Sequence, residues 1–177
     1  MEIVRELLGH GANVNAARTN DGMTSLMWAC EYGLLETVRE LLGRGANVNA
    51  AKTDDGMTSL MWASQNGHLE TVHELLWRGA NVNAAHTDNG MTSLMWASWL
   101  GHMEVVRELL GRGAAVNAAC TDDGLTALMF ACSDDHLETA RLLLQHGATK
   151  AAADFHGKTA YEHASAANAA LRKLVRL

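Results

Sequence analysis

Apolar residues in this chain fall into short blocks that alternate with glycines, and residues 53–86 show the pattern clearly. The first block of that segment lies at residues 59–64. The second block has apolar residues at the spacing of one helical face: Leu69, Val72, Leu75 and Leu76. The pattern predicts two short helices. Because neither helix is long enough to be stable alone, each requires a neighbour against which its apolar face can pack.

Turn and capping residues delimit these predicted helices. Asp55-Gly56 is a tight-turn signal, since glycine adopts the positive φ that such turns need. Thr58 stands where an N-cap residue would begin the first helix. Gly67 and Gly79 follow the two apolar blocks, as glycines that end helices do. The expected order is therefore turn, helix, glycine, helix, glycine and an extended return to the next turn.

The same unit recurs along nearly the whole chain. The turn glycine recurs at spacings of 34, 34, 34 and 33 residues. Gly22, Gly56, Gly90 and Gly124 lie in an Asp/Asn-Gly-Met/Leu-Thr motif, and Gly157 lies in the related His-Gly-Lys-Thr. Residues 19–52 and 53–86 are identical at 26 of 34 positions, and residues 53–86 and 87–120 at 25 of 34. Units of this kind bury a continuous core by stacking on one another.

The unit resembles the ankyrin repeat, through the match D-x-x-G-x-T-x-L-x-x-A-x-x-x-G-H-x-x-x-V-x-x-L-L-x-x-G-A-x-V-N-A. The resemblance implies an all-α fold, an ankyrin-repeat α-solenoid of stacked helix-turn-helix units with β-turn and hairpin loops. It also implies a protein-binding concave surface. We interpret residues 1–177 as a single ankyrin repeat domain that contains a partial N-terminal unit, full units and a C-terminal capping unit. Their expected bounds are 1–18 for the partial unit, 19–52, 53–86, 87–120 and 121–153 for the full units, and 154–177 for the cap.

Two features of this pattern have structural consequences. The family usually opens its first helix with Thr-Pro-Leu-His, whereas this chain has methionine in place of that histidine: Met27, Met61, Met95 and Met129. We expect these methionines to pack rather than to form the hydrogen bonds of an imidazole. The ends of the stack are expected to be its weakest parts, because residues 1–18 match only a second helix and its return.

Composition and charge narrow the classes of function. The net charge is −6 and the pI about 5.8, which disfavours nucleic-acid binding. No run of residues is long and apolar enough to span a membrane. Three cysteines in a chain without an export signal predict free thiols in the cytoplasm, with the nucleus as an alternative. We expect a monomer in which Cys30 and Cys132 are buried and too far apart to bridge.

Candidate catalytic and metal-binding residues have structural interpretations. His68, His102 and His136 recur at one position of the repeat and are interpreted as one structural feature. The remaining histidines lack zinc-ligand spacing, and the acidic residues at the turns lack a calcium-loop pattern. No catalytic motif is present, so we expect no enzyme activity, no metal and no cofactor. The aromatic residues of the first helices are interpreted as a packing ladder: Trp28, Trp62, Trp96 and Phe130.

The positions at which near-identical units differ are the candidate binding residues. Two such positions precede the glycine that ends the first helix, and a third precedes each turn. In ankyrin repeats these positions match the concave helix surface and the hairpin tips. The predicted partner-binding residues are Glu31, Tyr32, Lys52, Gln65, Asn66, His86, Trp99, Leu100, Ser133 and Asp134. Among them we expect Trp99 and Leu100 to form the hot spot, because the other units carry more polar residues there.

We therefore expect a scaffold that binds a protein partner. Two alternatives are that the chain is the substrate-recruiting segment of a larger enzyme, or that it is an engineered repeat scaffold. The resemblance further implies that four loop asparagines match a position that asparaginyl hydroxylases modify in some ankyrin proteins: Asn15, Asn49, Asn83 and Asn117. A structural role for these asparagines is the favoured interpretation.

Overall fold

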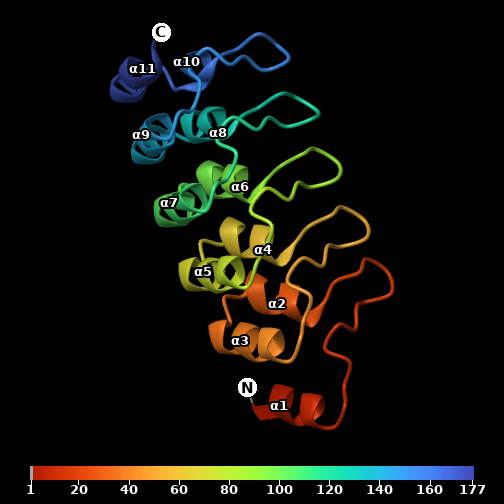
Figure 1. The fold of residues 1–177 in the computed structure, drawn as a ribbon. Helices are drawn as coiled ribbons and strands as arrows, with labels where there is room; N and C mark the ends of the chain where they lie inside the picture. Colours follow the sequence, from red (N-terminus) through yellow and green to blue (C-terminus); the bar gives the residue numbers. More distant parts are fainter. Residues whose placement is uncertain (1) are drawn as a thin grey trace.

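Short helices stacked in two rows form the molecule, and hairpin loops project from one side of the stack (Figure 1). The computed structural model describes residues 2–177, so Met1, the first residue of the predicted partial unit, lies outside the described residues. The two chain termini lie at opposite ends of the stack, which confirms the predicted α-solenoid. Within the described residues there are helices and isolated β-bridges but no strand.

The row of helices beside the hairpins is called the inner row here, and it contains the first helix of each unit. Its members are α2 (Ser25–Glu31), α4 (Ser59–Gln65), α6 (Ser93–Trp99), α8 (Ala127–Ser133) and α10 (Ala160–His163). The outer row contains the second helices. Its members are α1 (Glu2–Gly9), α3 (Leu35–Gly43), α5 (Leu69–Trp77), α7 (Met103–Gly111), α9 (Leu137–Gln145) and α11 (Ala169–Val175).

Threonine caps begin the first four inner helices, as the sequence predicts for Thr58. The Thr58 hydroxyl oxygen accepts a hydrogen bond from the Met61 backbone N–H at 3.3 Å, which satisfies one of the free donors of the first turn. The helix stops at Gln65, and Gly67 follows with a φ of +70°. The predicted helix ends are confirmed here and at Gly79, which follows α5 with a φ of +86°.

The hairpins join each unit to the next through their backbones. Within a hairpin, Ala51 and Thr58 form an antiparallel bridge. Between hairpins, the Thr53 N–H donates to the Asp21 carbonyl oxygen at 2.9 Å, and the Thr87 N–H donates to that of Asp55 at 2.8 Å. Because the same bond recurs at each step, the turns are stacked in register along the molecule.

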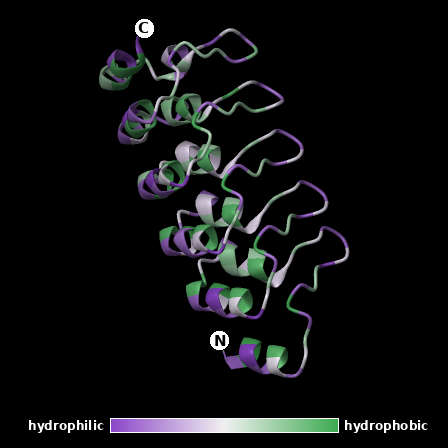
Figure 2. Cartoon of the chain, in the orientation of Figure 1, coloured by the Kyte–Doolittle hydropathy of each residue, from purple (hydrophilic) through white to green (hydrophobic). Residues whose placement is uncertain are grey.

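The apolar core runs through the stack between the two rows. Each inner helix packs on its neighbours along the row and on the outer helix of its own unit. The four methionines that replace the family histidine are buried, which confirms their packing role. Hydrophilic residues gather at the hairpin tips and on the outward faces of the outer row (Figure 2). The first outer helix, α1, has no buried residue.

Candidate partner-binding surface

The predicted hot-spot residues lie at the carboxyl ends of the inner helices. Trp99 is the last residue of α6 and Leu100 is its C-cap, and their side chains are 37% and 44% exposed. At the matching positions, Tyr32 is exposed and so is Asp134. The structure therefore places an apolar pair in contact with solvent in the middle of the stack, as the comparison between units predicts. The other predicted residues of this row are half-buried or exposed: Glu31, Gln65, Asn66 and Ser133.

A histidine from the following unit holds the backbone of this row. The His136 Nε2–H donates to the Trp99 carbonyl oxygen at 3.0 Å, which joins α6 to the unit of α9. His68 and His102 make the matching bonds to Glu31 and Gln65, at 3.1 and 3.0 Å. These contacts explain why the histidine recurs. They also fix the direction of the side chains that vary, so a partner would meet a preformed surface.

Aromatic contacts support Trp99 on two sides. Its ring stacks on that of Trp96, with centroids 5.6 Å apart, and meets that of Phe130 at 5.7 Å. Trp99 is thus partly a packing residue as well as an exposed one. Leu100 has the more exposed side chain of the pair and is the cleaner probe of binding.

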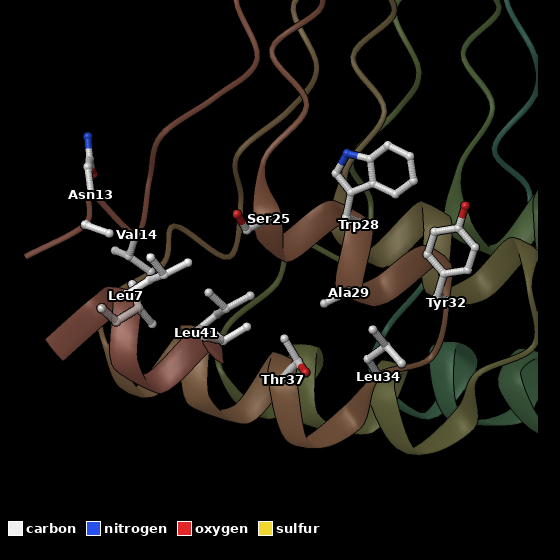
Figure 3. Close-up of a pocket in the computed structure, with 13 residues that line it drawn as sticks. Leu7, Asn13, Val14, Ser25, Trp28, Ala29, Tyr32, Leu34, Thr37 and Leu41 are labelled. Carbon is white, nitrogen blue, oxygen red and sulfur yellow. The ribbon is translucent and has the colours of Figure 1, made fainter. Parts of the chain in front are cut away.

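Three of the four aromatic residues that the sequence predicts to form a packing ladder are covered by the core. Trp62 and Trp96 are half-buried and Phe130 is buried. Trp28 is 41% exposed. Its ring stacks on Tyr32 of its own helix end (Figure 3), with centroids 5.6 Å apart, and the Arg18 guanidinium lies 6.0 Å from its centroid. The physical reason is its place in the stack, since α2 is the first inner helix within residues 2–177.

The residues that precede the turns differ from one another in burial and in hydrogen bonding. The Lys52 side chain is only 12% exposed and its Nζ lies 2.8 Å from an Asp55 carboxylate oxygen. Burial works to raise the pKa of Asp55, but the bonds from Lys52 and the Met57 N–H lower it overall. His86 is half-buried, and its Nδ1 accepts from the Asp88 N–H. The geometry therefore gives Lys52 a structural bond inside its own turn.

The corresponding residue of the last hairpin of this set, Cys120, is buried. Its Sγ lies 3.8 Å from the Met95 Sδ. Among the described residues, Cys120, Asp122 and Asp123 form the group with potential metal ligands within 4.8 Å of one another. One Asp123 oxygen already accepts the Leu125 N–H at 2.9 Å. Desolvation, together with the neighbouring aspartates, raises the pKa of Cys120 to about 12, so the thiolate that a metal would need is disfavoured.

All three thiols are buried, one more than the sequence predicts. Burial also raises the pKa values of Cys30 and Cys132 to about 12. Since the thiolate is the reactive form, we expect all three to react with a disulfide reagent at pH 8 far more slowly than in urea. Stopped-flow or spectrophotometric counting of released thiolate measures this directly. One thiol that reacts within the mixing time in native buffer would contradict the burial of that residue.

The loop asparagines have a structural role in the described loops. The Asn83 Nδ2–H donates to the Gly113 carbonyl oxygen at 3.3 Å, and its Oδ1 accepts the Ala115 N–H at 2.8 Å. Matching bonds are made by Asn15, Asn49 and Asn117. Each side chain therefore links its return loop to the next one and supplies partners for backbone groups that the helices leave free.

Comparison with known proteins agrees with this architecture. A family model described as ankyrin repeats (three copies) matches residues 1–52, 50–120 and 94–177. No curated protein matches the chain. Within residues 2–177, no helix is long and apolar enough to cross a bilayer. Ankyrin repeats are in general modules of protein–protein interaction, and the family is typically non-enzymatic. Because the matches extend over the whole sequence, the chain belongs to the ankyrin-repeat family.

Proposed function

We propose that this chain is a scaffold that binds a protein partner through the exposed carboxyl ends of its inner helices, with Trp99 and Leu100 at the centre. The observation that carries the proposal is the exposure of this apolar pair on a backbone that His136 holds in place. An exposed tryptophan beside an exposed leucine is the kind of group that contributes much of the energy at protein interfaces. In this proposal His86 and the half-buried Lys52 lie at the rim of the partner-binding surface.

Rigid presentation is the mechanism we propose. Histidine bonds, asparagine bonds and stacked turns order the surface before a partner arrives, so little conformational entropy is lost on binding. We propose that residues 1–177 act together as one monomeric recognition domain with the unit bounds given above. The three free buried thiols suit a reducing compartment, which supports a cytoplasmic setting.

Trp99→Ala tests the proposal by its effect on affinity. A hot spot should lose at least ~2 kcal/mol of binding energy, or about 30-fold in Kd. Trp77→Ala is the matched control, because Trp77 is 66% exposed on the outer row and has an Arg78 guanidinium 5.0 Å from its ring centroid. A photo-reactive residue at position 100 would capture the partner from lysate of the source organism, and calorimetry with that purified partner would then compare the variants.

A comparison of Trp99→Ala with a second variant, Leu100→Ala, separates binding from packing. Because Trp99 contacts two other rings, Trp99→Ala should cost about 1–3 kcal/mol of stability as well. Leu100→Ala has no such ring contact and should weaken binding with the smaller effect on melting. If both variants bind the captured partner as tightly as the wild-type chain, this surface is not the binding site.

A further inference from the structure

Charge is divided unevenly between the two sides of the stack around Trp99 and Leu100. Within residues 87–136 the basic side chains are Arg107 in the outer helix α7 and Arg112 at its C-cap. Each pairs with a glutamate of the same helix. The hairpins and the end of α8 carry five aspartates in this segment: Asp88, Asp122, Asp123, Asp134 and Asp135. The inner side of this segment therefore has negative charge and neither lysine nor arginine.

In two other units the chain supplies its own cation to the turn. The Arg18 guanidinium pairs with the Asp21 carboxylate. The Lys52 Nζ lies 2.8 Å from an Asp55 oxygen and 3.2 Å from an Asp54 oxygen. Carboxylates at this turn thus bind a guanidinium or an ammonium group, and the residue just before the turn provides it.

The next two hairpins keep the carboxylates and lose that cation. Residues 53–56 and 121–124 both read Thr-Asp-Asp-Gly, but the residue before the second turn is the buried Cys120 rather than a lysine. In the hairpin between them, His86 takes the same position. Within residues 2–177, three carboxylates of these two turns have no basic side chain at ion-pair distance, and they are called the unpaired hairpin carboxylates here: Asp88, Asp122 and Asp123.

The unpaired hairpin carboxylates lie within reach of Trp99 for one short segment of a partner. The hairpin of residues 85–92 leads directly into α6, and Trp99 ends that helix about 10 Å further along its axis. The turn precedes the helix by four residues, a span of at most about 14 Å. An extended chain of about seven residues covers both lengths. Asp134 and Asp135 follow α8, whose Phe130 ring meets that of Trp99, so further negative charge lies beside the apolar pair.

We propose that the partner presents a short segment in which basic residues flank an apolar one. The apolar residue contacts Trp99 and Leu100, and a lysine or arginine side chain binds the unpaired hairpin carboxylates, as Lys52 does within its own turn. This inference rests on the proposed function and specifies the chemistry of its partner. Complementary charge speeds encounter and selects among partners more than it adds affinity, so the carboxylates determine which segments are accepted. A nucleic acid would be repelled, because its phosphates carry the same charge as this surface.

Selection of random dodecapeptides displayed on phage, with the full chain immobilised, tests this chemistry. We expect the enriched peptides to have an excess of Lys and Arg beside an apolar residue. The triple variant Asp88→Asn, Asp122→Asn, Asp123→Asn should lose that excess. Its turns should persist, because Asn89 already accepts the turn N–H of its own hairpin at 3.0 Å. A library that yields no binder, or binders without the basic excess, overturns the inference.

A fluorescein-labelled copy of the most enriched peptide then gives affinities by fluorescence anisotropy. Cys120→Lys should weaken binding about 3-fold or more, because it restores the ion pairs of the Lys52 turn and occupies carboxylates that the peptide needs. Cys120→Ala changes the same residue without adding charge and should bind as the wild-type chain does. Circular dichroism checks that both variants are folded. Equal affinity of Cys120→Lys and Cys120→Ala for the peptide, with no loss in the triple variant, overturns the inference.

Leu100→Ala separates this inference from the proposed function. Loss of peptide affinity in both Leu100→Ala and the triple variant supports both. Loss in Leu100→Ala alone means that the surface binds an apolar segment without regard to its charge, so the inference is wrong and the proposed function stands. Loss in the triple variant alone means that the hairpins bind basic segments without the apolar pair, which contradicts the proposed function.

Discussion

Replacing Leu109 with alanine is expected to lower the free energy of unfolding by about 2–5 kcal/mol. Leu109 is fully buried in α7, between the inner and outer rows, so removing its branched end leaves a cavity in the core. The loss combines the transfer energy of the missing carbons with the contacts that the cavity wall no longer makes. Urea denaturation followed by circular dichroism measures the change.

Leu7→Ala is the matched control for that substitution. Residues 4–9, 38–43 and 106–111 all read Val-Arg-Glu-Leu-Leu-Gly, so Leu7 and Leu109 occupy the same local sequence. Leu7 is exposed to more than half its extent, and we expect its replacement to cost less than about 1 kcal/mol. Equal losses for the two variants would contradict the difference in packing between the end and the middle of the stack.

Replacing Gly67 with alanine is expected to cost about 2–3 kcal/mol. A side chain at the φ of +70° costs about 1–2 kcal/mol, because the left-handed conformation is unfavourable for L-residues. The added Cβ would also stand 2.6 Å from the His102 Nδ1, so the imidazole must move. Moving it weakens the bond from the His102 Nε2–H to the Gln65 carbonyl oxygen, worth about 0.5–1.5 kcal/mol.

Gly79→Ala separates the two causes. Gly79 has a φ of +86°, and a Cβ added there meets nothing within 4 Å. Its replacement should therefore show the backbone cost alone. Adding His102→Ala to Gly67→Ala should give less than the sum of the two single losses, since the clash is then gone. Urea midpoints for all four variants give this comparison, and strict additivity would show that the contact with the imidazole is unimportant.

The chain itself contains a natural version of this experiment. The turn that follows α8 has Asp135 in place of the glycine, with a φ of +59°. In the next unit the N-cap of the outer helix, the place that His136 holds for α9, is Asn168 rather than a histidine. A side chain is tolerated at Asp135, in keeping with the absence of an imidazole that would occupy the same space. Sequence comparison alone showed the recurring glycines and the recurring histidines as separate features.

The candidate site was partly predictable from sequence. Trp99 and Leu100 stood out because the other units carry more polar residues at positions with the same local environment, and the structure finds both exposed. The exposure of Lys52 and Cys120 was harder to predict, because the pattern marks their position as variable without showing which way the side chain points. The carboxylate of Asp55 holds Lys52 in its own hairpin, and Cys120 turns inward against Met95.

The repeat, the short helices, their threonine caps and the glycines that end them could all be predicted from the amino-acid sequence. These features depend on residues close together in the chain, and recurrence in successive units made each signal stronger. Which copies of a repeated residue are buried became clear from the folded stack alone. Leu7 and Leu109 share one hexapeptide, yet one lines an open groove and the other is buried. Burial in a stack depends on the neighbouring unit, and identical local sequences carry no information about whether that neighbour is present.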